Sequence, residues 1–144
     1  MRYIIILVFG LLTFASFGQT KDEVVILSRI GEFSKEQLNN SGPSKLTFVT
    51  DINKAAELAK LDIQNGIPFL LLKGGIAPTV IGTDPEFEKK YEIYFYEYGC
   101  TGPEHEIIIA YNEMIFDFLT MKYGKEWLKE VRKDVIGLKN WKKK

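Results

Sequence analysis

Four consecutive apolar residues, Phe69–Leu72 (FLLL), constrain the fold of this chain more than any other stretch. The run follows Pro68 and ends shortly before Gly74. A strand with one solvated face alternates apolar and polar residues, whereas a strand that is covered on both faces is apolar throughout. We therefore expect a central strand here, with other elements packed against both of its faces.

A second strand is predicted from Tyr91 onward, where the apolar period becomes two. Ile93 and Phe95 point to one face of this segment, and three tyrosines point to the other: Tyr94, Tyr96 and Tyr98. Leu46–Val49 and Thr79–Ile81 are further strand candidates. The apolar run at 24–27 fits either a strand or a helix start, because short runs do not discriminate between the two.

Helical signals separate and follow these strands. They are a capping box at Ser34–Gln37, an apolar stripe from Ile52 to Ile63, a helix start at Asp84 and Pro85, a broad stripe from Ile107 to Leu119 that ends at Gly124, and a last helix with Trp127, Leu128, Val131 and Val135. Together the elements predict a small α+β domain at residues 19–144. Its sheet of about four or five strands would carry one middle helix and a C-terminal helical pair packed on it.

The first 18 residues have the pattern of a secretory signal peptide. A positive residue, Arg2, precedes the apolar run Ile4–Phe14 and a small-residue end at Gly18. The run is shorter than the roughly 20 residues of a membrane span, which makes an uncleaved anchor the weaker alternative. We expect an exported bacterial protein, periplasmic or extracellular after cleavage near Gly18.

Charge is distributed unevenly along the chain. Residues 122–144 contain nine bases and three acids, whereas residues 19–121 contain nine bases and sixteen acids. A solvated helix face explains the basic end, and contact of the lysines Lys142, Lys143 and Lys144 with an anionic membrane surface is the functional alternative. Because these bases are interleaved with acids and the chain is expected to be exported, we predict no nucleic-acid partner.

The only cysteine and the only histidine lie close together, before the long helix. If Thr101 caps that helix, Thr101 and Glu104 form a capping box, and Cys100 and His105 occupy the two positions that pack as a hydrophobic staple. The chemical interpretation is a Cys100–His105 catalytic pair with Glu104 orienting the ring. The structural interpretation is a capped turn alone, which is favoured because catalytic pairs usually converge from distant segments.

The tyrosine face is the stronger binding candidate. Tyr94, Tyr96 and Tyr98 together offer apolar area and hydroxyl groups to a protein, a peptide or a glycan. The alternative is that the C-terminal helical pair covers this face, because a broadly apolar helix needs a partner surface. One cysteine and one histidine without repeated spacing make no metal motif, so we expect no metal ion and no cofactor.

Three stretches, GIPFLLLKGGIAP, YFYEYGC and YGKEWLKEVRKDVIGLKNW, resemble a family of small exported bacterial proteins with no assigned function. The resemblance implies no activity and no site. From the residues we predict a non-enzymatic binding or interaction domain of the bacterial envelope. A small cysteine-dependent enzyme that uses Cys100 and His105 is the alternative.

Overall fold

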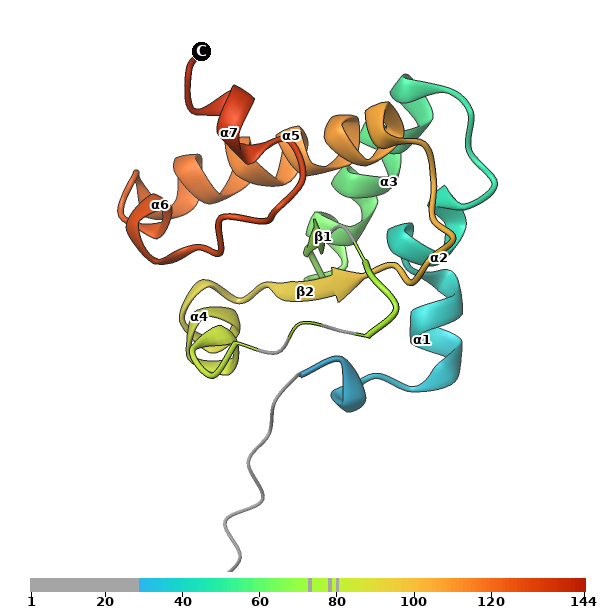
Figure 1. Cartoon of the computed structure of the whole chain (residues 1–144), viewed down its shortest axis with the longest axis horizontal. Coiled ribbons are helices and arrows are strands. Elements are labelled where there is room, and N and C mark those ends of the chain that lie inside the picture. Colours follow the sequence, from blue (N-terminus) through green and yellow to red (C-terminus); the bar gives the residue numbers. More distant parts are fainter. Residues whose placement is uncertain (1–28, 73, 78, 80) are drawn as a thin grey trace, which may run out of the picture.

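The computed structural model describes residues 29–72, 74–77, 79 and 81–144. The predicted leader and the apolar run at 24–27 lie outside these residues. The described chain forms two strands, one 3-10 turn and seven α-helices (Figure 1). In chain order these are η1 (Arg29–Glu32), α1 (Lys35–Asn40), α2 (Gly42–Leu46), α3 (Ile52–Gln64), β1 (Phe69–Leu72), α4 (Asp84–Tyr91), β2 (Tyr94–Glu97), α5 (His105–Tyr123), α6 (Trp127–Glu130) and α7 (Leu138–Trp141).

The predicted sheet of four or five strands is wrong. In the described residues the sheet has two strands, which run parallel with Phe69 opposite Tyr94 and Leu72 opposite Glu97. β1 lies where the sequence predicts it and is buried throughout, whereas β2 covers only Tyr94–Glu97 of the strand predicted from Tyr91, because α4 continues to Tyr91. Helices make up most of the rest, so the fold is mainly helical rather than an α+β sheet that carries one middle helix and a C-terminal pair.

Two strand candidates fail for a common reason. Leu46 ends α2, which has Pro43 in its first turn, and it is completely buried on the inner face of that short helix. Thr79 and Ile81 lie outside any helix or strand. A short apolar run is compatible with a strand, a helix or a loop, and only its tertiary partners decide which one forms.

The predicted helix starts are largely confirmed. The capping box forms, with the Gln37 N–H donating to Ser34 Oγ at 3.2 Å and the Ser34 N–H donating to the Gln37 side chain at 2.9 Å. Asp51 caps α3 by accepting from the Asn53 N–H at 2.8 Å. The helix predicted at Asp84 is α4, although its N-cap is the preceding residue.

The predicted last helix is interrupted. After α6 the backbone becomes extended at Val131, and α7 begins only at Leu138. Between them, Val135 forms an antiparallel bridge with Leu72 of β1. A helix could not offer this contact, because its backbone groups already bond within the helix.

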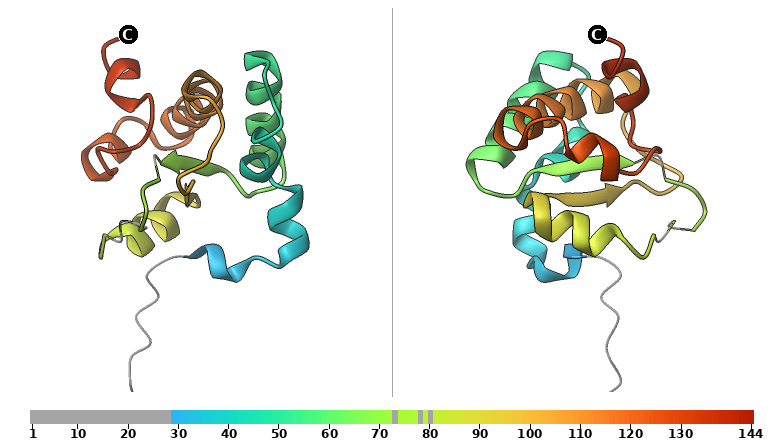
Figure 2. Two further views of the ribbon diagram at one scale, coloured as in Figure 1. Left: turned by 45° about the vertical axis from the view of Figure 1, so that its right-hand side comes forward. Right: turned by 90° about the vertical axis from the view of Figure 1, so that its left-hand side faces the viewer.

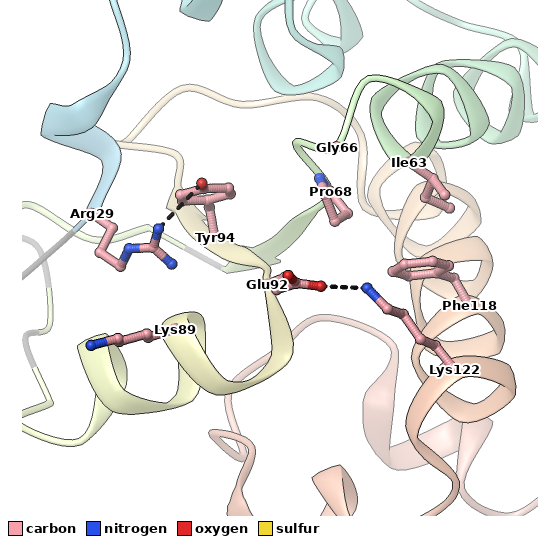
Figure 3. Close-up of a pocket in the computed structure, with 9 residues that line it drawn as sticks. All are labelled: Arg29, Ile63, Gly66, Pro68, Lys89, Glu92, Tyr94, Phe118 and Lys122. Atoms are coloured by element: carbon pink, nitrogen blue, oxygen red, sulfur yellow. Dashed lines mark hydrogen bonds and ion pairs between the residues drawn. The ribbon is translucent and has the colours of Figure 1, made fainter.

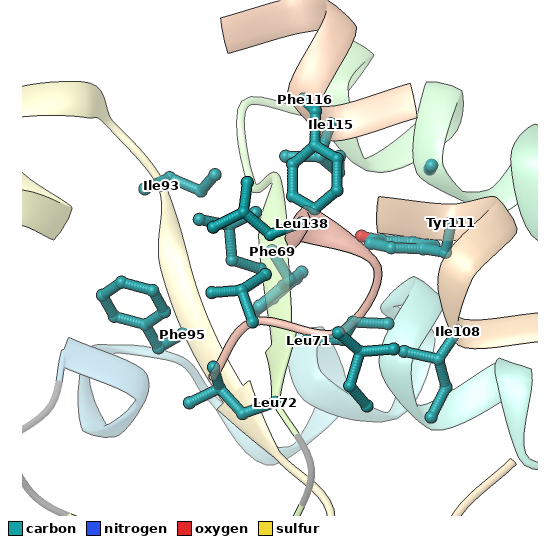
Figure 4. Close-up of a cluster of buried hydrophobic side chains, with 14 of the residues drawn as sticks. Phe69, Leu71, Leu72, Ile93, Phe95, Ile108, Tyr111, Ile115, Phe116 and Leu138 are labelled. Carbon is teal, nitrogen blue, oxygen red and sulfur yellow. The ribbon is translucent and has the colours of Figure 1, made fainter. Parts of the chain in front are cut away.

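The two strands lie at the centre of the molecule. Figure 2 (left) shows α1, α2 and α3 on one side of them and α4, α6 and α7 on the other, and Figure 1 shows α5 running across the top. The core fills the space between these layers with buried side chains of both strands, α5 and α7 (Figure 4). The expectation of cover on both faces of the central strand is therefore confirmed.

A side-chain amide occupies the outer edge of β1. Asn112 of α5 is completely buried, and its oxygen accepts from the Leu71 N–H at 2.9 Å. Its NH₂ group donates to the carbonyl oxygens of Leu71 and Ile136, both at 2.9 Å. The Ile136 N–H also donates to the Leu71 carbonyl at 3.2 Å. No place is left at this edge for another strand of the sheet.

A side-chain carboxylate occupies the outer edge of β2. Glu88 of α4 is buried, and its two oxygens accept from the Phe95 N–H at 2.8 Å and from the Arg29 N–H at 3.2 Å. Burial raises the pKa of Glu88, while these hydrogen bonds act in the opposite direction. The carboxylate thereby attaches η1 to β2 and satisfies the backbone of the strand.

A third buried polar group joins three helices. Asp62 of α3 accepts from the Gly42 N–H of α2 at 2.9 Å and from the Tyr111 hydroxyl of α5 at 2.6 Å. A Cβ at Gly42 would lie 2.4 Å from the Asp62 carboxylate, so glycine is needed for this approach. Burial raises the pKa of Asp62 to about 6.

Replacing Asn112 by alanine should lower the free energy of unfolding by at least about 2 kcal/mol, because it leaves the buried Leu71 N–H without a partner. Urea unfolding of the variant measures this effect. Asn39, an exposed residue of α1, provides the control, and its alanine variant should stay within about 0.5 kcal/mol of wild type. Equal losses in the two variants would contradict the proposed role of Asn112.

The raised pKa of Asp62 predicts a pH-dependent stability. The folded chain holds the Asp62 proton more tightly than the unfolded chain, so this contribution is complete below about pH 4 and is lost as the pH rises through about 6. Asp62→Asn removes the titration. Between about pH 4 and about pH 7, wild type should therefore lose about 3 kcal/mol of unfolding free energy relative to the variant, which does not titrate at this position. A difference that stays constant over this range would rule out the effect.

Candidate functional site

The three predicted binding tyrosines differ in exposure. Tyr98 is buried, and its hydroxyl donates to the Pro43 carbonyl at 2.7 Å. Tyr96 is half-buried between Phe69 and Tyr98, with edge-on ring contacts at 6.2 and 5.0 Å. Tyr94 is half-buried at the start of β2. The tyrosines therefore do not form one open platform, and each has a different environment.

The observed cover of the tyrosine face comes from the N-terminal segment. Phe33, just after η1, packs edge-on against the Tyr94 ring at 4.5 Å, and Pro43 of α2 accepts the Tyr98 hydroxyl. On the opposite face of β2, Phe95 stacks on Phe87 of α4 at 5.3 Å. Phe33 and Pro43 of the N-terminal segment thus contact Tyr94 and Tyr98, where the sequence suggested the C-terminal pair.

The predicted cap at Thr101 does not form. α5 begins at His105 with Glu104 as its N-cap, and no side chain caps this end. With Glu104 as the N-cap, Cys100 and His105 no longer occupy the two positions of a hydrophobic staple, and both are exposed. Before the helix, Gly102 packs closely on Tyr98, with only 3.0 Å from a Cβ at this position to the Tyr98 Cβ.

Cys100 and His105 nevertheless line one pocket, which we call the cysteine pocket. Its volume is about 540 Å³, and its lining includes Leu72, Gly74, Tyr98, Cys100, His105 and Ile136. The pocket lies where β1 and β2 end and α5 begins. Gly74 passes so close to the Tyr98 carbonyl that no side chain fits there. Glu104 is not among the lining residues.

A second pocket, the basic pocket, lies at the other end of the strands (Figure 3). It has a volume of about 510 Å³ and lies beside Pro68, just before β1, and Tyr94, the first residue of β2. Its polar and aromatic lining consists of Arg29, Lys89, Glu92, Tyr94, Phe118 and Lys122. Three cations and one carboxylate therefore line one hollow.

Two of the cations lie against aromatic rings on opposite sides of the pocket. The Arg29 guanidinium lies 4.8 Å from the centre of the Tyr94 ring and donates to the Tyr94 hydroxyl at 3.4 Å. The Lys122 ammonium lies 5.7 Å from the centre of the Phe118 ring. Figure 3 shows these two groups on either side of Glu92. Cation–π contacts of this kind restrict where a long side chain points.

Both cations also have an internal carboxylate partner. Glu32 accepts from Arg29 at 3.0 Å, and this hydrogen bond raises the pKa of Arg29 and lowers that of Glu32. Glu92 forms an ion pair with Lys122, which lowers the pKa of Glu92 and raises that of Lys122. Lys89 makes no ion pair with any residue between 29 and 144 that the structure describes.

Glu92 has an unusual backbone. Its φ of 50° and ψ of 48° are left-handed, and it is the one residue other than glycine with a positive φ in the described ranges. Glycine or asparagine is usual at such a helix end, because a Cβ is strained there. Glu92 therefore places a carboxylate side chain at a position whose backbone conformation favours glycine or asparagine.

The sequence identified only part of the basic pocket. Tyr94 was predicted from the tyrosine alternation, but Arg29, Glu92 and Lys122 carry no pattern of their own. They come from η1, the end of α4 and the end of α5, which meet only after folding. The one sequence signal is that Glu92, and not glycine, follows α4. This signal can be recognised only once the end of that helix is known.

Other classes of site find no support in the described residues. Within residues 29–72, 74–77, 79 and 81–144, no group of three or more histidine, cysteine, aspartate or glutamate side chains is placed to hold a metal ion. None of the helices described is both long and apolar enough to span a membrane. No protein-family model, curated protein or solved structure matches the chain. The resemblance to small exported proteins therefore stays a prediction.

Proposed function

We propose that the chain is an exported, non-enzymatic binding domain of the bacterial envelope that takes a peptide segment in the basic pocket. One observation carries the proposal: three cations and the predicted binding residue Tyr94 line one hollow of about 510 Å³. Cationic side chains that lie against aromatic rings are partly ordered before a ligand arrives, which reduces the entropy lost on binding.

A peptide fits this lining better than a sugar does. Sugar recognition uses the open face of an aromatic ring, but the Tyr94 ring already contacts Arg29 at 4.8 Å and Phe33 at 4.5 Å. Phe118 similarly has the Lys122 ammonium near its ring. The groups that remain available are charges, hydrogen-bond donors and the backbone next to Pro68, all of which suit an extended polar chain.

Titration of the isotope-labelled chain from residue 19 with acidic, neutral and basic heptapeptides tests the proposal by NMR. At least one peptide should shift the signals of Gly66, Tyr94 and Lys122 in a saturable way. Tyr94→Ala should weaken this binding about tenfold, because it removes the ring and the hydroxyl that hold Arg29 in the pocket. Phe48→Ala, which removes an aromatic ring that is 88 % exposed, is the matched control. Absence of saturable shifts at the basic pocket would refute the proposal.

The cysteine pocket supports a second candidate, a small enzyme that uses Cys100 with His105 as base. The favouring observation is that both residues line one pocket at the carboxyl ends of two parallel strands, where ligands bind in α/β sheets.

Thiol labelling over a range of pH separates this candidate from the first. A catalytic Cys100 should reach half its maximal labelling rate well below the value of about pH 8.5 that is typical of a free thiol. His105→Gln should move this midpoint upward. An ordinary midpoint that is insensitive to His105→Gln would exclude the enzyme and leave the binding domain unaffected.

A further inference from the structure

The basic pocket already contains one carboxylate, and this group has features of an exchangeable occupant. Glu92 lies between the two ring-bound cations in Figure 3 and pairs with Lys122. The Glu92 side chain is 68 % exposed, and its second contact is a hydrogen bond from the Tyr123 hydroxyl at 3.0 Å. Exposed ion pairs contribute little to stability, so separation of this pair disturbs the fold very little.

The backbone of Glu92 strengthens this interpretation. A left-handed conformation is strained for glutamate, and such strain clusters at ligand-binding sites and switch regions. The side chain of Glu92 extends from this point across the pocket to the end of α5. It joins the C-terminal ends of α4 and α5, the two elements that contribute Lys89 and Lys122 to the lining.

The cations retain donors that a ligand can use. Arg29 uses Nε and Nη2 for Glu32 and Tyr94, and its Nη1 group makes no hydrogen bond to the residues that the structure describes. Lys89 is exposed at the rim. If Glu92 turns outward, Lys122 becomes available as well. The pocket then presents three cations and no carboxylate of its own.

We infer that the basic pocket recognises carboxylate groups of an acidic peptide, and that Glu92 holds the place of one of these groups in the free protein. This inference rests on the proposed function and names the ligand class of the same pocket. The peptide carboxylate replaces Glu92 at Lys122, and a second acidic group of the peptide reaches Arg29. The cations that already lie over the rings of Tyr94 and Phe118 favour a peptide over an acidic glycan as the source of the carboxylates.

Three probes test the inference by calorimetry and NMR on the chain from residue 19. They are a blocked alanine heptapeptide with two glutamates, the same peptide with two glutamines, and an oligomer of a uronic acid. The glutamate peptide should shift the signals of Tyr94, Glu92 and Lys122, and the glutamine peptide should bind at least about tenfold more weakly, because the charge contacts are lost. Binding of the glutamate peptide should also weaken as salt is added, because salt screens the charges.

Substitution of Glu92 gives the decisive result. Glu92→Gln should bind the glutamate peptide about threefold to fivefold more tightly than wild type, because the internal competitor is removed and an exposed ion pair competes only weakly. Lys122→Gln should weaken binding by about the same factor. Glu126→Gln is the matched control, because the Glu126 side chain is as exposed as that of Glu92 and forms an ion pair with Lys129 outside the pocket. The control should bind as wild type does.

The outcomes separate this inference from the proposed function. Equal binding of the glutamate and glutamine peptides at the basic pocket would overturn carboxylate recognition and leave the peptide-binding function standing. Unchanged affinity in Glu92→Gln would overturn the role of Glu92. Tighter binding of the uronic acid oligomer than of the glutamate peptide would overturn the peptide assignment. Absence of shifts at the pocket with every peptide would overturn both proposals.

Discussion

The amide of Asn112 gives β1 the hydrogen bonds that a third strand would otherwise supply. It accepts from the Leu71 N–H and donates to the Leu71 and Ile136 carbonyls, all at 2.9 Å. The buried backbone of β1 needs such partners, because an unpaired buried polar group is costly. With this edge occupied by Asn112 and the opposite edge of the sheet by Glu88, the sheet stops at two strands and helices surround it.

The same edge contacts fix where the two pockets lie. Asn112 attaches α5 to β1, so the start of α5 lies beside the carboxyl ends of both strands and forms the cysteine pocket. Glu88 attaches η1 to β2, so Arg29 lies beside Tyr94 at the opposite end and forms one side of the basic pocket. Buried polar groups that stabilise the fold thereby position the groups available for function.

The sequence predicted elements whose signals are local. The four-residue apolar run, the tyrosine alternation, the capping box at Ser34 and the stripe of α3 all appear as expected. Predictions that depended on distant partners failed: the number of strands, the continuity of the last helix and the cap at Thr101. Among the candidate site residues, Tyr94 was predicted, whereas Arg29, Glu92 and Lys122 have no local signal.

By itself, the sequence determined that a fully apolar strand had to be covered on both faces, since its residues leave no polar side for solvent. It also determined where α1 and α3 begin, because their caps are made by residues close in the chain. Only the tertiary structure decided that a buried amide and a buried carboxylate close the edges of the sheet. Only it decided which cations and aromatic rings share a pocket, because η1, α4 and α5 meet through long-range packing and not through any sequence period.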